Sequence, residues 1–243
     1  PVSSIEPFNE STSGKWVFPI FQQGCNIDRG GQVELLAFLK THLAQQGVGE
    51  VKIAAADERN PSAAFATDAF MKNKSASSQG ITFRASDLYD KVNVHTADNA
   101  VPFRDNGERD KLRAAVGSKR LWVSDYNDTD PSGLALAQSI LEDLNHLRPT
   151  AWLYFQAVEP YSDKGLVTGN FHMMPSQESG RGQPTSVSVK YYMMAQFSRF
   201  IRAGQTIIGS SDDRTVAAFD ASNRKLTAVS LNAAATGQVI DLD

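Results

Sequence analysis

Val51-Lys52-Ile53-Ala54-Ala55-Ala56 is a short apolar run, followed by the acidic pair Asp57-Glu58 and then by an amphipathic stretch at Ser62–Met71. The run has the length and composition of a buried β-strand, and the stretch after it has the apolar spacing of a helix. A strand followed by a helix is the repeating unit of a parallel sheet. The segment therefore predicts an α/β fold with polar residues at the carboxyl end of a strand.

Similar apolar runs recur along the chain, at intervals of roughly 30 to 50 residues, which is the length of a βα repeat with variable loops. They are Val2–Phe8, Lys91–His95, Arg120–Ser124 and Ala151–Ala157. Helical patterns lie between them, at Gly31–Gln46, Glu108–Val116 and Gly133–Leu147. We expect a (β/α)8 barrel that lacks its first three βα units, because five strands cannot close an eight-stranded barrel. An open barrel exposes a strand edge, so a missing N-terminal segment or a partner chain is expected to complete it.

The C-terminal part of the chain has a different pattern. A polar stretch rich in glycine, proline and serine at Tyr161–Thr185 predicts a long loop, and Ser188–Ile201 predicts a last helix. Short strands separated by polar turns then follow, at Thr206–Gly209, Thr215–Asp220 and Lys225–Asn232. We therefore expect a barrel domain at residues 1–203 and part of an appended β-sandwich, with too few strands to be complete, at residues 204–243.

Composition excludes several classes of protein. The 243 residues include 41% hydrophobic ones and carry a formal net charge of −3, with no basic cluster of the kind that binds nucleic acid. No apolar stretch is long enough to predict a membrane span. The chain has one cysteine and four widely spaced histidines, so we expect neither an internal disulfide nor a metal site. The chain has no Gly-rich phosphate loop before a predicted helix, so we expect no nucleotide cofactor.

Two carboxylates follow predicted strands on the side where barrel enzymes keep their active sites. Glu10 comes after Ile5-Glu6-Pro7-Phe8-Asn9, and Asp125 comes after Leu121-Trp122-Val123-Ser124, three strands further on. In a closed barrel this separation brings the two residues across the mouth from each other. A facing pair of carboxylates is the usual equipment for glycoside hydrolysis, although either residue alone could be a solvated loop residue or a helix cap.

Further candidates for substrate binding lie at the ends of the same strands. Each also has a structural interpretation: Glu58 could cap the next helix, His95 could be a structural hydrogen-bonding group, Trp16 could cover the barrel mouth, and the aromatic residues near 152 could be barrel core. The candidates are Trp16, Glu58, His95, Trp152 and Gln156, to which Asn9 and Tyr126 are added as neighbours of the carboxylates.

Four motifs in order resemble glycoside hydrolase family 30, and most closely its endo-β-1,6-galactanase branch. They are Glu6–Glu10, Gln22–Cys25, Leu121–Tyr126 and Lys190–Arg202. The resemblance covers essentially the whole chain and implies barrel strands four to eight followed by an attached β-sandwich. It also implies that Glu10 is the general acid/base, that Asn9 binds the substrate's 2-hydroxyl, and that Asp125 stands in the nucleophile position.

The chain departs from the family pattern at this nucleophile position. The family has Ser-Glu-Tyr or Ser-Glu-Phe, whereas this chain has Ser124-Asp125-Tyr126. The shorter side chain withdraws the carboxylate by roughly 1.5 Å, a change on the scale to which attack geometry is sensitive. Asp128 and Asp130, in the same loop, are possible substitutes.

The resemblance implies a secreted, retaining glycosidase without a cofactor, acting on β-1,6-galactan. The alternatives are an inactive or weak carbohydrate-binding relative, or another activity of the family such as β-glucosidase, glucosylceramidase or xylanase.

Overall fold

The computed structural model describes residues 2–16, 26–98, 100–159, 164–169, 184–234 and 236–237. The chain forms two compact units, each built from segments that are separate in sequence. The first unit consists of Pro1–Asp98, Phe103–Tyr126 and Pro149–Leu153, and the second of Asn99–Pro102, Asn127–Arg148 and Tyr154–Asp243.

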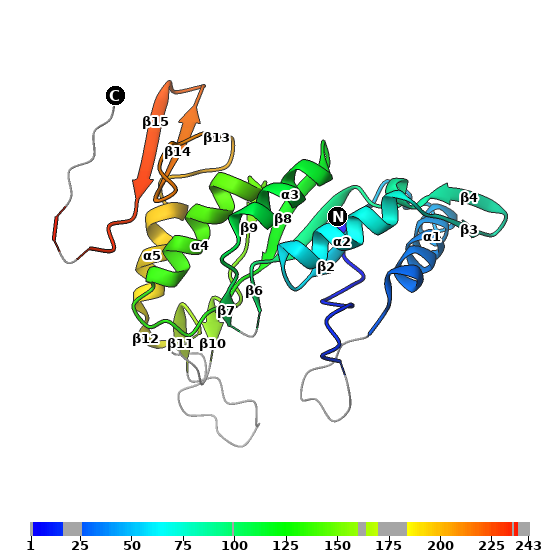
Figure 1. Cartoon of the computed structure of the whole chain (residues 1–243), viewed down its shortest axis with the longest axis horizontal. Helices are drawn as coiled ribbons and strands as arrows, with labels where there is room; N and C mark the ends of the chain where they lie inside the picture. Colours follow the sequence, from blue (N-terminus) through cyan, green and yellow to red (C-terminus); the bar gives the residue numbers. More distant parts are fainter. Residues whose placement is uncertain are drawn as a thin grey trace, which may run out of the picture. The chain divides into compact units, whose positions relative to one another are not determined.

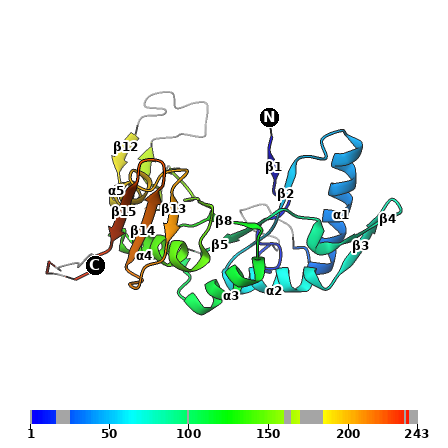
Figure 2. The ribbon, with the colours of Figure 1, turned by 90° about the horizontal axis from the view of Figure 1, so that it is seen from above.

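The first unit is built on a curled five-stranded sheet in which every pair of neighbouring strands is parallel (Figures 1 and 2). The strand order is β1-β2-β5-β8-β9, which is also the order along the chain, as in a half-barrel. The strands are β1 (Ser4–Ile5), β2 (Lys52–Glu58), β5 (Lys91–His95), β8 (Arg120–Asp125) and β9 (Ala151–Trp152).

All five predicted strands are present, but the two outermost are shorter than predicted. β1 pairs with β2 only through Ser4 and Ile5, whereas the run Val2–Phe8 predicted a longer strand. Pro7 lies just beyond the paired residues and has no backbone N–H to extend a hydrogen-bond ladder. The predicted strand Ala151–Ala157 likewise pairs with β8 only at Ala151 and Trp152.

Three helices of the first unit follow the predicted pattern and begin at polar caps. α1 (Arg29–Gln45), α2 (Pro61–Lys72) and α3 (Asn106–Val116) start after Asp28, Asn60 and Asp105, whose side chains each accept a backbone N–H of the first turn. Between the helices and the sheet lies an apolar core whose residues are at most 4% exposed. It contains Val33, Leu36, Ile53, Ala64, Met71, Val92, Val94, Leu112, Val116, Leu121 and Val123.

Several short elements of the first unit were not predicted. A hairpin of β3 (Ser75–Ser78) and β4 (Ile81–Arg84) follows α2 and lies beside α1 (Figure 1). A 3-10 turn, η1 (Ala85–Asp87), leads from it into β5, and β6 (Ala97–Asp98) follows β5. These segments are polar and lack a continuous apolar face, so period-2 and period-3.6 patterns do not reveal them.

The second unit contains a helical pair, α4 (Leu134–Glu142) and α5 (Val189–Ser198), which contact each other. The predicted helix Gly133–Leu147 is two segments, because α4 continues as a π-helical turn, η2 (Asp143–Leu147), and ends at Arg148 in a left-handed conformation. Gly133 has a φ of +73°, and an added Cβ would lie 2.7 Å from Met193 Cγ, so the close approach of the α5 side chain requires glycine here.

Short strands make up the rest of the second unit. They include β7 (Val101–Pro102), and β10 (Val158–Glu159), β11 (Val167–Gly169) and β12 (Pro184–Val187) form a three-stranded sheet. The prediction of one long loop at Tyr161–Thr185 is therefore wrong at Val167–Gly169 and at Pro184–Thr185, because these residues belong to the paired strands β11 and β12. Residues 160–163 and 170–183 of that predicted loop lie outside the described residues.

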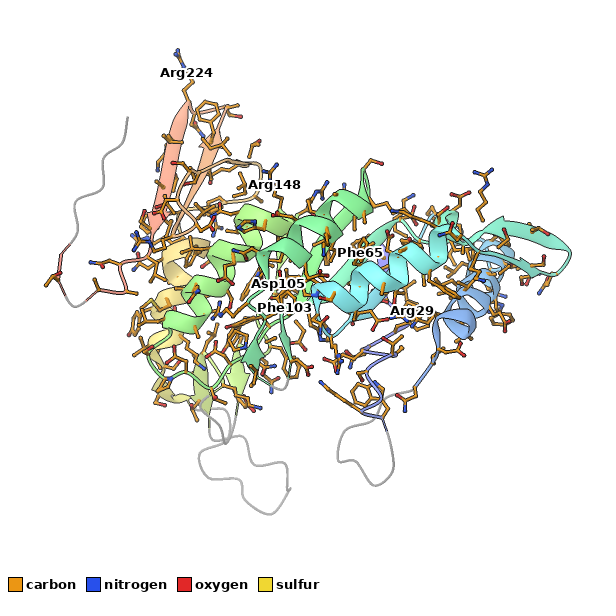
Figure 3. The ribbon with its side chains drawn as sticks, viewed as in Figure 1. Arg29, Phe65, Phe103, Asp105, Arg148 and Arg224 are labelled. Carbon is orange, nitrogen blue, oxygen red and sulfur yellow. The ribbon has the colours of Figure 1, made fainter. Side chains whose placement is uncertain are left out.

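The C-terminal strands agree with the prediction. β13 (Thr206–Ile208), β14 (Thr215–Asp220) and β15 (Lys225–Ser230) form an antiparallel sheet in chain order. Arg224 lies at the tip of the β14–β15 turn with a φ of +52° (Figure 3). That these strands belong to a β-sandwich domain beginning at residue 204 stays a prediction.

Candidate active site

Two irregularities in the parallel sheet shape the carboxyl ends of its central strands. Between β2 and β5 the register shifts so that Asp57 has no partner residue, and between β5 and β8 it shifts so that Ser124 has none. Such bulges commonly redirect side chains beside active sites. Here the two extra residues meet, because Ser124 Oγ donates a 2.5 Å hydrogen bond to Asp57 Oδ1.

Glu10 is held in the turn after β1 by both its backbone and its side chain. Its φ is +47°, and its backbone N–H donates a 2.8 Å hydrogen bond to the Asp57 carbonyl. One side-chain oxygen, Oε1, lies 3.0 Å from His95 Nδ1, and the other, Oε2, accepts from Lys15 Nζ at 3.1 Å. Both carboxylate oxygens therefore face nitrogen donors, and the residue is 9% exposed.

These donors control the ionisation of Glu10. Burial, the largest single effect, favours the neutral acid, but the hydrogen bonds from His95 and Lys15 outweigh it and lower the pKa of the carboxyl group below its ordinary value. Lys15 is itself held by a hydrogen bond to Asp98, and Asp98 Oδ2 lies 3.5 Å from Arg59 Nη1. Cations and carboxylates thus alternate from the buried side of Glu10 to its exposed side.

His95 ends β5 and lies between two carboxylates. Its Nδ1 faces Glu10, and its Nε2 is 3.5 Å from Asp57 Oδ1. Burial alone would lower the pKa of the ring, but hydrogen bonds to Asp57 and Glu10 and the negative charges of Asp57 and Asp125 raise it to about 10. A carboxylate oxygen therefore lies near each ring nitrogen, an arrangement that favours the imidazolium form.

A second set of polar residues, Glu6, Lys91 and Asn93, lies deeper on the same side of the sheet. Glu6 is partly buried, and burial followed by the negative charge of Asp57 raises the pKa of its carboxyl group to about 9. Its Oε1 accepts from the Phe8 N–H, and its Oε2 is buried without a hydrogen-bond partner, as is Asn93 Oδ1. Lys91 Nζ lies 3.3 Å from the centre of the Trp122 ring.

Glu58 has a structural environment. It is fully buried, and its two carboxylate oxygens accept hydrogen bonds from Thr12 Oγ1 (2.5 Å) and Thr67 Oγ1 (2.8 Å). Arg29, labelled in Figure 3, in turn donates from Nε to Thr67 Oγ1 at 2.9 Å. Glu58 thus connects the turn after β1 to α2, and the cap of α2 is Asn60 rather than this residue.

Asp125 ends β8 next to His95, and the two residues are paired in register across the strands. It is half-buried, and the Thr96 N–H donates to its carbonyl at 3.3 Å. Tyr126, which follows, is fully buried, with its ring 5.3 Å from the half-buried ring of Trp152. The structure therefore gathers Glu10, His95 and Asp125 at one edge of the sheet.

The two possible substitutes for Asp125 have other partners within the second unit. Asp128 is 1% exposed, and its Oδ1 lies 3.0 Å from Lys190 Nζ, which is equally buried. Asp130 accepts backbone N–H bonds from Ser132 and Ala135, and these contacts stabilise the start of α4. These contacts favour structural roles for both residues.

The remaining candidates are spread over different environments. Asn9 is exposed, and Trp16 is half-buried with its Nε1 donating to the Glu10 carbonyl at 3.1 Å. Gln156 is half-buried and belongs to the second unit. The motif Gln22–Cys25 lies outside the described residues.

Within the described ranges, no group of three or more histidine, cysteine, aspartate or glutamate side chains is arranged to hold a metal ion. In a separate search of the same ranges, no helix has the length and apolar character needed to cross a membrane.

The chain as a whole is similar to known proteins in sequence and in structure. No family model matches the chain. A curated endo-beta-1,6-galactanase from Hypocrea rufa is 32% identical over 231 residues, which cover 94% of this chain and 43% of the relative. The chain is homologous to this galactanase. The match confirms the resemblance to the galactanase branch of glycoside hydrolase family 30, and the chain spans less than half the length of its curated relative.

Solved structures show a related fold. A conserved exported protein from Bacteroides fragilis matches 93% of this chain and 54% of its own, with a TM-score of 0.69 and 18% identity. The catalytic domain of GH30 xylanase C from Talaromyces cellulolyticus matches 90% of this chain and 47% of its own, with a TM-score of 0.59 and 19% identity. At these identities the matches concern the fold, and they confirm the α/β architecture.

Sequence reasoning missed three residues of the cluster. Asp57 is at the end of a predicted strand, but its role depends on a bulge that no periodic pattern reveals. Lys15 lies in the turn region after β1 and Asp98 ends the short strand β6, and their pairing joins segments 83 residues apart in sequence. The only sequence signal for Asp57 was its position directly after a predicted strand. The same signal led to Glu58, its neighbour, being chosen as the candidate instead.

Proposed function

We propose that the chain provides the carboxylate pair of a retaining glycoside hydrolase that cleaves β-1,6-galactan. The observation that carries the proposal is the position of Glu10 and Asp125, which follow two strands of one parallel sheet and lie on either side of His95. Barrel enzymes assemble their active sites at this edge. The 32% identity to a named endo-beta-1,6-galactanase supports the substrate.

Each carboxylate has one role in the proposed double displacement. Protonated Glu10 donates its proton to the glycosidic oxygen as the bond to the leaving sugar breaks, and Asp125 attacks the anomeric carbon to form a glycosyl-enzyme. Glu10 then removes a proton from water, which attacks the same carbon and releases Asp125. Two inversions leave the anomeric configuration unchanged.

Several surrounding residues have supporting roles in this proposal. Asn9 is exposed beside Glu10 and binds the 2-hydroxyl group of the sugar, and Trp16 and Trp152 provide half-buried aromatic surfaces against which sugar rings stack. We further propose that the protein is secreted, as the exported relative from Bacteroides fragilis is by its name, and that a missing N-terminal segment or a partner chain completes the barrel.

Product analysis tests the proposal. The full chain is incubated with β-1,6-galactan and, in parallel, with β-1,4-xylan, and the anomeric configuration of new reducing ends is followed by proton NMR before mutarotation. We expect release from galactan with retained β configuration, and loss of at least about 100-fold in rate in Glu10→Gln. Release of α-anomers, or preference for xylan, would contradict the mechanism or the substrate respectively.

A second candidate function is carbohydrate binding without cleavage. Two observations favour it: Asp125 is one methylene shorter than the glutamate of the family pattern, and the lowered pKa of Glu10 opposes the protonated form that a general acid needs. Calorimetric binding of β-1,6-galacto-oligosaccharides by folded chain that releases no reducing sugar would establish this function instead.

A further inference from the structure

Asp57 contacts three separate elements of the sheet edge. Its carbonyl accepts the Glu10 N–H at 2.8 Å, its Oδ1 accepts from Ser124 Oγ at 2.5 Å, and the same oxygen lies 3.5 Å from His95 Nε2. The residue has a φ of +50° and is the extra residue of a bulge. A left-handed backbone is uncommon outside glycine, although aspartate adopts it more readily than most residues.

The imidazole ring that Asp57 faces has a carboxylate at each nitrogen. The His95 side chain is 5% exposed, so water does not compete effectively for either nitrogen. Neutral imidazole has one N–H, whereas imidazolium has two, so only the charged ring can direct an N–H at both carboxylates, Glu10 at 3.0 Å and Asp57 at 3.5 Å. The titratable groups around the ring are Glu10 from the turn after β1, Asp57 from β2 and Asp125 from β8, with Lys15 beyond Glu10, and with Glu6 and Lys91 deeper.

We propose that Asp57 is a positioning residue, which holds the His95 ring as a double donor between two carboxylates and so fixes the orientation and ionisation of Glu10. Asp57 acts through His95 and does not contact the substrate. The kinetic part of this inference rests on the proposed function, because it takes Glu10 as the acid/base. The structural part, which concerns the coupling of Asp57, His95 and Glu10, does not.

The alternative is that Asp57 only shapes the end of β2. If its carboxylate is also not coupled to the His95 ring, Asp57→Asn, which keeps the shape and the hydrogen bond from Ser124, leaves the titration of His95 unchanged. In the positioning role, removing the negative charge destabilises the imidazolium ion, and His95 loses its proton at lower pH. Glu10 then faces a neutral ring, so its carboxyl group keeps a proton to higher pH.

The experiment is an NMR titration of the full chain with isotope-labelled histidine. In the native sequence we expect His95 to stay protonated through pH 8, and in Asp57→Asn we expect its midpoint to fall by about 1–3 pH units. His42, which stacks on Phe38 in α1, provides a second labelled ring in the same spectrum for comparison. Asp213→Asn is the matched control, because Asp213 pairs with His146 at 3.3 Å in the second unit and is not expected to affect His95.

A native His95 midpoint near the ordinary value of about 6.5 would overturn the proposal, and this result needs no variant to fold. An unchanged midpoint in folded Asp57→Asn would also overturn it.

If the chain is active, the alkaline limb of the pH profile of kcat/KM should move to higher pH in Asp57→Asn and in His95→Gln, with no further shift in the double variant. A uniform loss of rate without any shift of the limb would show that Asp57 is structural. If the coupling is found by NMR in a chain without activity, the proposed function fails while the positioning role stands.

Discussion

At Glu10, the two carboxylate oxygens face donors in different environments. His95 is on the buried side with a side chain 5% exposed, whereas Lys15 is on the outer side with a side chain 25% exposed. Since His95 occupies Oε1, Oε2 is the oxygen that an entering glycosidic oxygen reaches, and Lys15 stands in its way. In the proposed mechanism, proton donation from Glu10 therefore requires Lys15 to leave Oε2.

Replacing Lys15 by methionine tests this arrangement. Burial favours the neutral form of Glu10 and the donors from His95 and Lys15 oppose it, so removing Lys15 raises the pKa of Glu10. In an active chain, the alkaline limb of the kcat/KM profile should shift to higher pH, because that limb reports deprotonation of the acid. Lys15→Arg keeps a cation at this position and should keep the limb where it is. A Lys15→Met profile that superimposes on the native one would contradict the role of Lys15.

Glu6 predicts a pH dependence of stability. Its pKa is about 9 in the folded chain against 4.5 as an ordinary carboxyl, because burial and then the charge of Asp57 disfavour ionisation. A group with a raised folded-state pKa contributes stability that is fully present below pH 4.5 and is lost as pH rises towards 9.

Glu6→Gln, which resembles the neutral acid, should remove this loss. We expect the Tm of the variant to exceed the native Tm at pH 8 by on the order of 5 °C, and the difference to vanish near pH 4. Differential scanning calorimetry at both pH values measures it, with Glu34→Gln on the exposed side of α1 as the control. An equal Tm of native chain and variant at pH 8 would show that Glu6 is not held neutral.

At the scale of elements, helix caps and buried strands explain most of what could be predicted. β5 and β14 have the predicted bounds because each is a short apolar run between turn signals. The hairpin β3–β4 was missed because its residues are polar and partly exposed, so its pairing is decided by its position beside α1. The bulges at Asp57 and Ser124 depend on how neighbouring strands align, which a single sequence does not encode locally.

A buried ion pair between α5 and the segment after β8 should be essential for the second unit. Lys190 and Asp128 are each 1% exposed, and removing one partner of such a pair leaves the other charge buried. Lys190→Met is expected to lower the free energy of unfolding by about 3–5 kcal/mol in urea titrations. Lys225→Met, on the exposed face of β15, should change it by less than about 0.5 kcal/mol. Similar urea midpoints for the two variants would mean that the pair contributes little.

For the whole molecule, the fold and the site differ in how far the sequence predicts them. The order and parallel pairing of the five strands followed from apolar runs, and homology to the galactanase agrees with the motif order. Of the predicted site residues, the structure brings Glu10, His95 and Asp125 together, and it buries Glu58 behind them. Charge pairing between segments distant in sequence, as between Lys15 and Asp98, could not be predicted from the sequence because it depends on tertiary contacts.

The most direct test of the central claim compares rates of reducing-sugar release from β-1,6-galactan by the native chain, Asp125→Glu and Glu10→Gln, each shown to be folded by its melting transition. We predict that Asp125→Glu raises the rate, since it restores the reach of the family's carboxylate, and that Glu10→Gln lowers it by at least about 100-fold. Equal rates in all three proteins, or no release by any of them, would contradict the assignment of Glu10 and Asp125 as a catalytic pair in this chain.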